Sequence, residues 1–140
     1  MVTDLQFHTL KLGGMIGSQM VHCGGWGRPQ YARDDCSYYY PESNLWNETD
    51  SELDMIKSRY FASYASTDHG ILVTGGYNFG SCYLSYAEYL PKAGEKWEPL
   101  PDVPFHSNGA CLVQLNSTHT LHIGGQADTD CHPVADTTNR

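Results

Sequence analysis

Residues 71–78 read ILVTGGYN, a short apolar run that ends at two glycines. A glycine pair is costly in a strand, because glycine loses more backbone entropy than other residues and has no side chain to pack. The pattern nevertheless recurs. MVHCGG ends at Gly25, ILVTGG at Gly76 and LHIGG at Gly125, at intervals of about 50 residues. A recurrence at this spacing predicts a repeat architecture.

Aromatic residues recur at a nearly constant spacing after the first two glycine pairs. Tyr39 and Trp46 follow Gly24–Gly25, and Tyr89 and Trp97 follow Gly75–Gly76 at nearly the same spacing. The third pair, Gly124–Gly125, has no Tyr or Trp after it. A further pair at residues 13–14 is out of phase, and we interpret it as a hairpin turn.

Within one repeat, the pattern is that of short strands. RYFASYAS and GILVTGG are predicted to form a hairpin around the turn TDHG, CYLSYAEYL to form a third strand and KWEPL to begin a fourth. PLPDVPFHS is a predicted loop, because proline cannot donate to a strand ladder. SELDMIKSRY is the nearest approach to a helical pattern, and we expect a loop there. Four short strands per repeat are typical of one blade of a β-propeller.

These residues resemble the kelch repeat, in which an apolar strand ends in Gly-Gly and is followed by a Tyr, a Trp, a Pro-rich turn, Met-Pro and an Arg. Residues 71–104 match this pattern nearly throughout. In the first copy CGG, YYPESNLW and the Met55 and Arg59 of DMIKSR match it. The resemblance implies an all-β, kelch-type propeller of four-stranded antiparallel blades. The second copy departs from the pattern, since Val103 replaces the Met and no Arg follows before Ala110.

The whole chain, residues 1–140, is predicted to be one partial propeller domain with approximate blades 5–50, 58–104 and an incomplete 106–140. Propellers typically have about 4–8 blades, so this number cannot close a ring. Further blades of a larger protein, or self-association, would be needed to close it.

The five cysteines allow at most two disulfides. Cys23 and Cys36 lie on neighbouring antiparallel strands, where bridge geometry can be met, so a Cys23–Cys36 disulfide is predicted, with two buried free thiols as the alternative. Cys82 and Cys131 hold equivalent places after their glycine pairs, which favours repeat packing over a bond between them. Cys111 is predicted to be buried.

Composition argues against several classes of partner. The net charge of −8 disfavours nucleic acid and anionic membranes, and no apolar segment is long enough to span a bilayer. The N-terminal residues lack the apolar core of a signal peptide. The cysteines and the sequons at Asn47 and Asn116 nevertheless favour an extracellular location slightly over a cytoplasmic one.

No motif for catalysis, metal binding or cofactor binding is present. The histidines have no metal-ligand spacing, no nucleophile motif occurs, and the glycine pairs do not open a helix. We therefore expect a non-enzymatic protein without a cofactor. A fragment of a copper radical oxidase, which shares a kelch-like propeller, is the catalytic alternative.

The predicted function is a protein-interaction module that presents its loops to a protein partner. The loop after the first glycine pair contains Trp26, Arg28, Tyr31 and Arg33, which are residue types common at interface hot spots. An intracellular adaptor for ubiquitin ligases is another setting that the resemblance implies, although no BTB-like helical segment is present. A truncated product without a function of its own is a third hypothesis.

Overall fold

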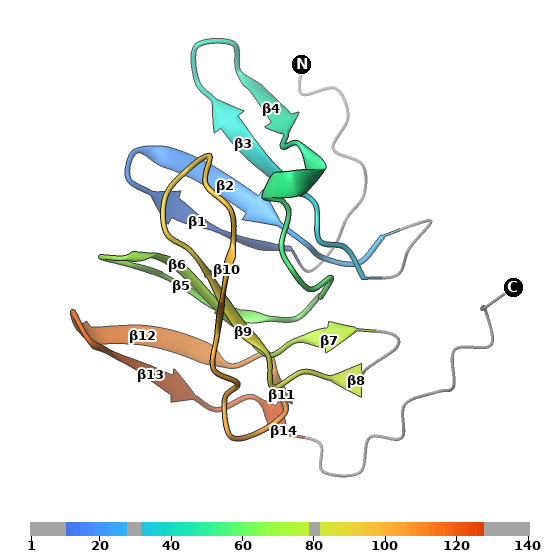
Figure 1. The fold of residues 1–140 in the computed structure, drawn as a ribbon, viewed down its shortest axis with the longest axis vertical. Coiled ribbons are helices and arrows are strands. Elements are labelled where there is room, and N and C mark those ends of the chain that lie inside the picture. Colours follow the sequence, from blue (N-terminus) through green and yellow to red (C-terminus); the bar gives the residue numbers. More distant parts are fainter. Residues whose placement is uncertain (1–10, 28–31, 79–81, 128–140) are drawn as a thin grey trace, which may run out of the picture.

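The structure is a computed structural model that describes residues 11–27, 32–78 and 82–127. The described residues form three main antiparallel sheets and two short two-stranded ladders. The three main sheets follow one another along the chain and are stacked from top to bottom in Figure 1. A single turn of 3-10 helix, η1 (Ser51–Leu53), lies in the segment between the first two sheets. In the described part of the chain, no helix is long and apolar enough to cross a membrane.

The first sheet has the strand order β1-β2-β3-β4. Its strands are β1 (Leu12–Ile16), β2 (Gln19–Cys23), β3 (Cys36–Tyr40) and β4 (Leu45–Glu48). The interpretation of residues 13–14 as a hairpin turn was wrong, because both glycines lie inside β1 and pair with β2. A Cβ at Gly14 would lie 2.7 Å from Ser66 Oγ of the second sheet. This glycine therefore allows the two sheets to approach closely.

The second sheet has the order β10-β9-β6-β5. Its strands are β5 (Ser63–Thr67), β6 (Gly70–Thr74), β9 (Ala87–Leu90) and β10 (Glu98–Leu100). The predicted third strand over CYLSYAEYL is divided in the structure. Its first residues form β8 (Cys82–Tyr83), which pairs with β7 (Tyr77–Asn78), and only residues 87–90 join the main sheet.

The third sheet consists of β12 (Cys111–Asn116) and β13 (His119–Ile123) in the described residues. A short ladder of β11 (Ser107–Asn108) and β14 (Gln126–Ala127) lies at its end. The inner strands β1, β5 and β12 contact one another in series, so the sheets are arranged side by side around one edge, as the blades of a propeller are. The ring is not closed.

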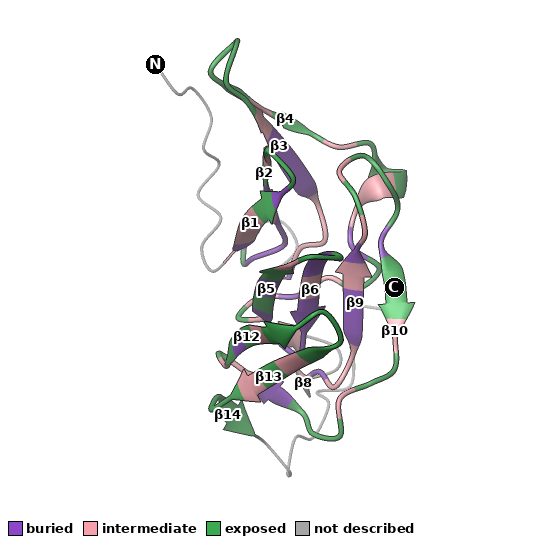
Figure 2. Ribbon diagram, turned by 90° about the vertical axis from the view of Figure 1, so that its left-hand side faces the viewer, coloured by how far each residue is buried: buried purple, intermediate pink, exposed green. Residues whose placement is uncertain are grey.

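Most of the hydrophobic core lies between the first and second sheets, and Figure 2 shows that β3 of the first sheet and β6 and β9 of the second are largely buried. Buried side chains from the two sheets meet there, together with Met55 of the connecting segment. The cluster contains Leu12, Ile16, Val21, Cys23, Cys36, Tyr38, Met55, Ile71, Val73, Leu90 and Trp97. Fewer apolar side chains are buried between the second and third sheets, and the strands β12–β14 are largely exposed.

Each of the first two glycine pairs is held against the backbone of the segment that enters the next sheet. The amide of Gly25 donates to the Arg59 carbonyl at 2.9 Å, and the amide of Gly76 donates to the Ser107 carbonyl at 2.8 Å. Gly75 has φ +64°, and a Cβ there would lie 2.3 Å from the Ser107 carbonyl oxygen. The pair therefore serves both to turn the chain and to admit a neighbouring backbone.

The register of the strands identifies which tyrosines correspond. Val21 pairs with Tyr38 in the first sheet, and Leu72 pairs with Tyr89 at the equivalent place in the second. Tyr38, and not Tyr39, is thus the counterpart of Tyr89. Tyr38 is also buried at 7% exposure.

The structure contains the predicted Cys23–Cys36 disulfide, with a Cα–Cα distance of 4.1 Å between the paired strands β2 and β3. The prediction for Cys111 was wrong, since this free cysteine is exposed. It lies on the face of β12 that is turned away from the second sheet.

Reduction of the disulfide is expected to lower the free energy of unfolding by about 3 kcal/mol, since it removes a constraint on the unfolded chain. Denaturant titrations with and without reductant measure this loss. Peptide mapping after alkylation of the unfolded chain should find Cys23 and Cys36 unlabelled until reductant is added. Labelling of both residues without reductant would contradict the bond.

Candidate functional site

Two loops lie at the end of the sheets where the glycine pairs end β2 and β6. The first begins at Trp26, which forms an isolated bridge with Ala32, and the second is the β7–β8 hairpin. The strands β7 and β8 are at the right of Figure 1, opposite the turns that join β1 to β2 and β5 to β6. Loops at one end of a propeller are the usual place for binding.

Four aromatic side chains gather at this end of the second sheet. The ring centroids of Tyr60 and Tyr77 are 5.1 Å apart, those of Tyr77 and Tyr83 are 5.6 Å apart, and those of Tyr60 and Phe61 are 6.3 Å apart. These are favourable distances for tilted and edge-to-face ring pairs. We name Tyr60, Phe61, Tyr77 and Tyr83 the aromatic cluster.

Backbone hydrogen bonds to two different segments hold the residues of the aromatic cluster in place. Tyr60 and Tyr77 exchange two backbone hydrogen bonds, of 3.0 and 2.8 Å. Phe61 has φ +58°, a conformation that bulky residues rarely adopt, and its carbonyl accepts a 2.8 Å hydrogen bond from the amide of Gly109. Phe61 is 47% exposed. Backbone strain of this kind concentrates at binding and active sites.

The Tyr60 hydroxyl of the cluster remains protonated at neutral pH. Burial, followed by the neighbouring Tyr77 and Tyr83, raises the pKa of Tyr60 above its ordinary value. A neutral phenol can both donate and accept a hydrogen bond. The cluster therefore offers apolar rings together with polar edges.

The predicted contact residues are only partly described. Trp26 is 39% exposed at the start of its loop. The Arg33 guanidinium forms a 2.5 Å ion pair with Asp35, so its charge is already partnered. Arg28 and Tyr31 lie outside the described residues.

The aromatic cluster was not predicted from the sequence, because its members come from two separate segments. Tyr60 and Phe61 precede β5, whereas Tyr77 and Tyr83 follow the glycine pair. The density of aromatic residues after Gly76 was a usable signal, but their contact with Tyr60 depends on the fold.

A buried ion pair lies beneath the second glycine pair. The Arg59 guanidinium is 2.6 Å from Glu88, and both side chains are fully buried. The same guanidinium donates to the carbonyls of Gly75 and Tyr86, at 2.9 and 3.0 Å. It therefore ties together the connecting segment, the glycine pair and β9.

Glu88 is satisfied on both of its oxygens. They accept hydrogen bonds from the backbone amides of Ile56, at 2.8 Å, and Lys57, at 3.4 Å. Burial raises the pKa of the Glu88 carboxyl, against the opposing effects of the Arg59 guanidinium and the two amides. Arg59 and the two amides belong to the connection between the first two sheets, and Glu88 belongs to β9. The pair is fully buried, so it is structural and is not accessible to a ligand.

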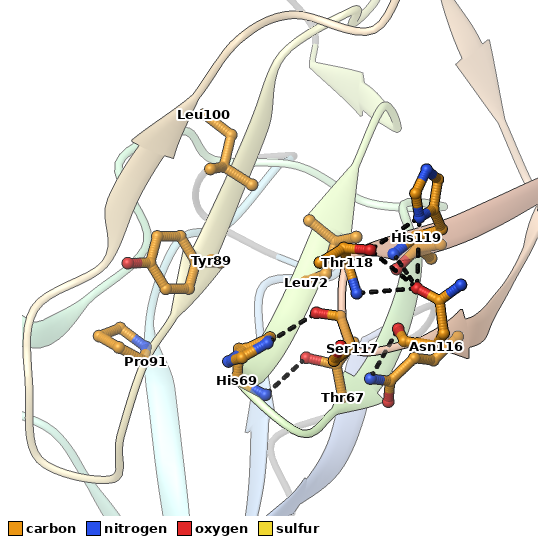
Figure 3. A pocket seen from close by; sticks show the side chains of 12 residues that line it. Thr67, His69, Leu72, Tyr89, Pro91, Leu100, Asn116, Ser117, Thr118 and His119 are labelled. Atoms are coloured by element: carbon orange, nitrogen blue, oxygen red, sulfur yellow. Dashed lines mark hydrogen bonds between the residues drawn. The ribbon is translucent and has the colours of Figure 1, made fainter.

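A pocket of about 600 Å³ opens between the second and third sheets. In Figure 3, Leu72, Tyr89 and Leu100 form one wall, and the turn from Asn116 to His119 forms the other. The His69 ring lies 2.7 Å from the Ser117 carbonyl oxygen and so links the two turns. No group of three metal-ligating side chains occurs among the residues that the structure describes.

The position of this pocket explains its origin. Tyr38, the counterpart of Tyr89, is covered by the second sheet and accepts a 3.2 Å hydrogen bond from the Gly94 amide. Tyr89 has no such cover from the two strands of the third sheet that are described. The pocket is thus a wedge between neighbouring sheets, with an apolar wall on the second sheet and a polar wall at the turn of the third.

Comparison with known families finds the kelch motif at residues 58–104. This range contains the second sheet, its glycine pair, Arg59, Tyr89 and Trp97. None of the curated proteins matches the sequence. The motif and the unclosed array of antiparallel sheets together identify a partial kelch-type propeller.

Proposed function

We propose that this partial kelch propeller is a protein-interaction module, and that it contacts its partner through the loops that follow the glycine pairs. Kelch motifs commonly mediate protein interaction. The observation that supports this surface in particular is the aromatic cluster, in which Phe61 is exposed on a strained backbone.

The composition of the surface suits a protein partner. Tyrosine and tryptophan supply large contact areas and are enriched among interface hot spots. Trp26, which is 39% exposed, adds an aromatic side chain at the start of the loop that follows the first glycine pair. The net charge of −8 favours a partner with a neutral or basic surface over an acidic one.

The disulfide supports action in an oxidising compartment, because disulfides persist in extracellular proteins and are rare in the cytosol. Both sequon asparagines, Asn47 and Asn116, are exposed, as glycosylation requires. An extracellular module is therefore the preferred setting, and peptide mapping of the secreted protein for glycans at these two residues tests it.

Phe61→Ser is expected to weaken partner binding more than 10-fold, which is the effect of removing a hot-spot side chain. Tyr64→Ser is the matched control, because Tyr64 is an aromatic residue of similar exposure, 42% against 47%, that lies in β5 and outside the cluster. Quantitative affinity purification compares the wild type and the two variants, and titration of the purified partner gives the change in Kd.

The proposal requires a partner that the wild type and Tyr64→Ser retain and that Phe61→Ser loses. It fails if the two variants bind equally, or if the wild type retains no protein above the level of Phe61→Ser.

A further inference from the structure

The three sheets stack in a single direction, and each has two distinct faces. We call the face turned toward the following sheet the forward face and the opposite one the rear face. The forward face of the first sheet meets the rear face of the second, as the approach of Gly14 to Ser66 demonstrates. The forward face of the second sheet meets the third, where the amide of Ala110 donates to Ser63 Oγ at 3.0 Å.

The rear face of the first sheet is more exposed than the equivalent face of the second sheet. Equivalent positions on the rear face of the second sheet are held by Ile71, Val73, Leu90 and Trp97, all of them at most 5% exposed. Their counterparts by strand register are Met20, His22, Tyr39 and Trp46. In this set Met20 is 44% exposed, and the other three are half-buried.

The aromatic side chains of that rear face are already stacked. The Trp46 ring lies 4.3 Å from the ring of His22 and 5.3 Å from that of Tyr39, measured between centroids. Met15, 45% exposed, continues the apolar surface along β1. Ser37 and Glu48 share this face with His22, and Lys11 Nζ lies 3.3 Å from His22 Nδ1. The face is therefore polar beside His22 and presents an ordered apolar surface around Met15, Met20 and Trp46.

The forward face of the third sheet is apolar and exposed as well. It carries Cys111 and Val113 on β12 and their strand partners Ile123 and Leu121 on β13. The exposed fractions of Val113, Leu121 and Ile123 are 41%, 43% and 50%. The equivalent positions in the first sheet include Val21 and Cys23, which are buried at 1% and 0%.

We propose that a second copy of this chain covers these faces, with the rear face of the first sheet of each copy packed on the forward face of the third sheet of the other. Every copy has both a rear face and a forward face for this contact. Within the chain, the same packing of a rear face on a forward face occurs between the first and second sheets and between the second and third. Two such contacts related by a twofold axis close a ring. A ring of two copies contains six sheets, within the range of about 4–8 blades in known propellers.

The wild-type chain is therefore expected to have twice its 15.6 kDa mass in solution. Sedimentation equilibrium over a range of concentrations measures the mass and the dissociation constant. Met20→Glu, on the rear face, and Leu121→Glu, on the forward face, are each expected to weaken the dimer more than 10-fold, because each buries a carboxylate without a partner. Leu45→Glu is the control, since Leu45 lies in β4 of the first sheet and is 46% exposed, but its side chain projects from the opposite face to Trp46.

Mixing the two variants tests the orientation of the contact. A Met20→Glu copy retains an intact forward face, and a Leu121→Glu copy retains an intact rear face, so the mixture is expected to form a heterodimer through one contact. Circular dichroism and thermal melts that match those of the wild-type chain show that the variants fold, since all three substituted side chains are exposed.

A wild-type dimer, monomeric single variants and a dimeric mixture support the proposal. A wild-type chain that stays monomeric at all concentrations overturns it, as does an assembly larger than two copies. Dimerisation of Met20→Glu alone would also overturn it, because the third sheets would then pair with each other. None of these outcomes bears on the aromatic loop surface, which Phe61→Ser tests separately.

Discussion

Arg59→Met is expected to lower the free energy of unfolding by about 3–5 kcal/mol, because it leaves the Glu88 carboxylate buried without its partner charge. The guanidinium and the carboxylate are 2.6 Å apart and fully excluded from solvent. The substitution also leaves the carbonyls of Gly75 and Tyr86 without their side-chain donor. Chemical denaturation of the variant and of the wild-type chain measures the difference.

Arg33→Met is the matched control for this prediction. The Arg33–Asp35 ion pair has a nearly equal separation of 2.5 Å, but its side chains are 22% and 16% exposed. Ion pairs accessible to water contribute at most about 1 kcal/mol, so this variant should lose far less stability. Equal losses from the two variants would show that burial of the Arg59–Glu88 pair has no special importance.

The double variant Arg59→Met with Glu88→Met tests how much of the loss of stability comes from the unpaired buried charge. It removes both charges, so it should lose less stability than the two single variants added together. It should not recover the stability of the wild-type chain, since the amides of Ile56 and Lys57 lose their acceptor. Full recovery would mean that these backbone groups find other partners.

Gly75→Ala is expected to cost about 2–5 kcal/mol. An alanine at φ +64° pays about 1–2 kcal/mol of backbone strain, and its Cβ would lie 2.3 Å from the Ser107 carbonyl oxygen. Because that oxygen accepts the Gly76 hydrogen bond, the connection into the third sheet must shift to make room. Denaturant or thermal unfolding measures the loss.

Gly124→Ala separates the two contributions. Gly124 is the counterpart of Gly75 in the third repeat, with φ +70°, and a Cβ there would meet no described atom within 4 Å. Only the conformational strain of about 1–2 kcal/mol is expected at this position. If the two alanine variants lost the same stability, close packing against Ser107 would not be the reason for the glycine.

Spacing in the sequence was sufficient for the class of fold, and it also distinguishes Tyr38 from Tyr39. The repeated glycine pairs and the strand patterns predicted an all-β partial kelch propeller, and the Cys23–Cys36 disulfide followed from the placement of both residues on adjacent strands. Tyr38 keeps the same distance from its glycine pair and its Trp as Tyr89 does. Strict spacing would therefore have chosen Tyr38 from the run of three tyrosines.

Other features could not be predicted, because they depend on neighbours that are distant in the chain. Gly13 and Gly14 resemble a turn, but they lie in a strand where the second sheet comes close. The aromatic cluster and the Arg59–Glu88 pair each join segments from different parts of a repeat. No local pattern specifies such contacts.

The sequence by itself determined the repeating unit, since the alternation of side chains and the positions that require glycine are local properties of the backbone. Only the tertiary structure decided which faces of the sheets are buried. Met20 and Ile71 occupy equivalent positions, yet Ile71 is fully buried and Met20 is 44% exposed. The physical reason is that a sheet face is buried only when a second sheet packs on it, and the residues of one repeat form only one of the two faces in such a contact.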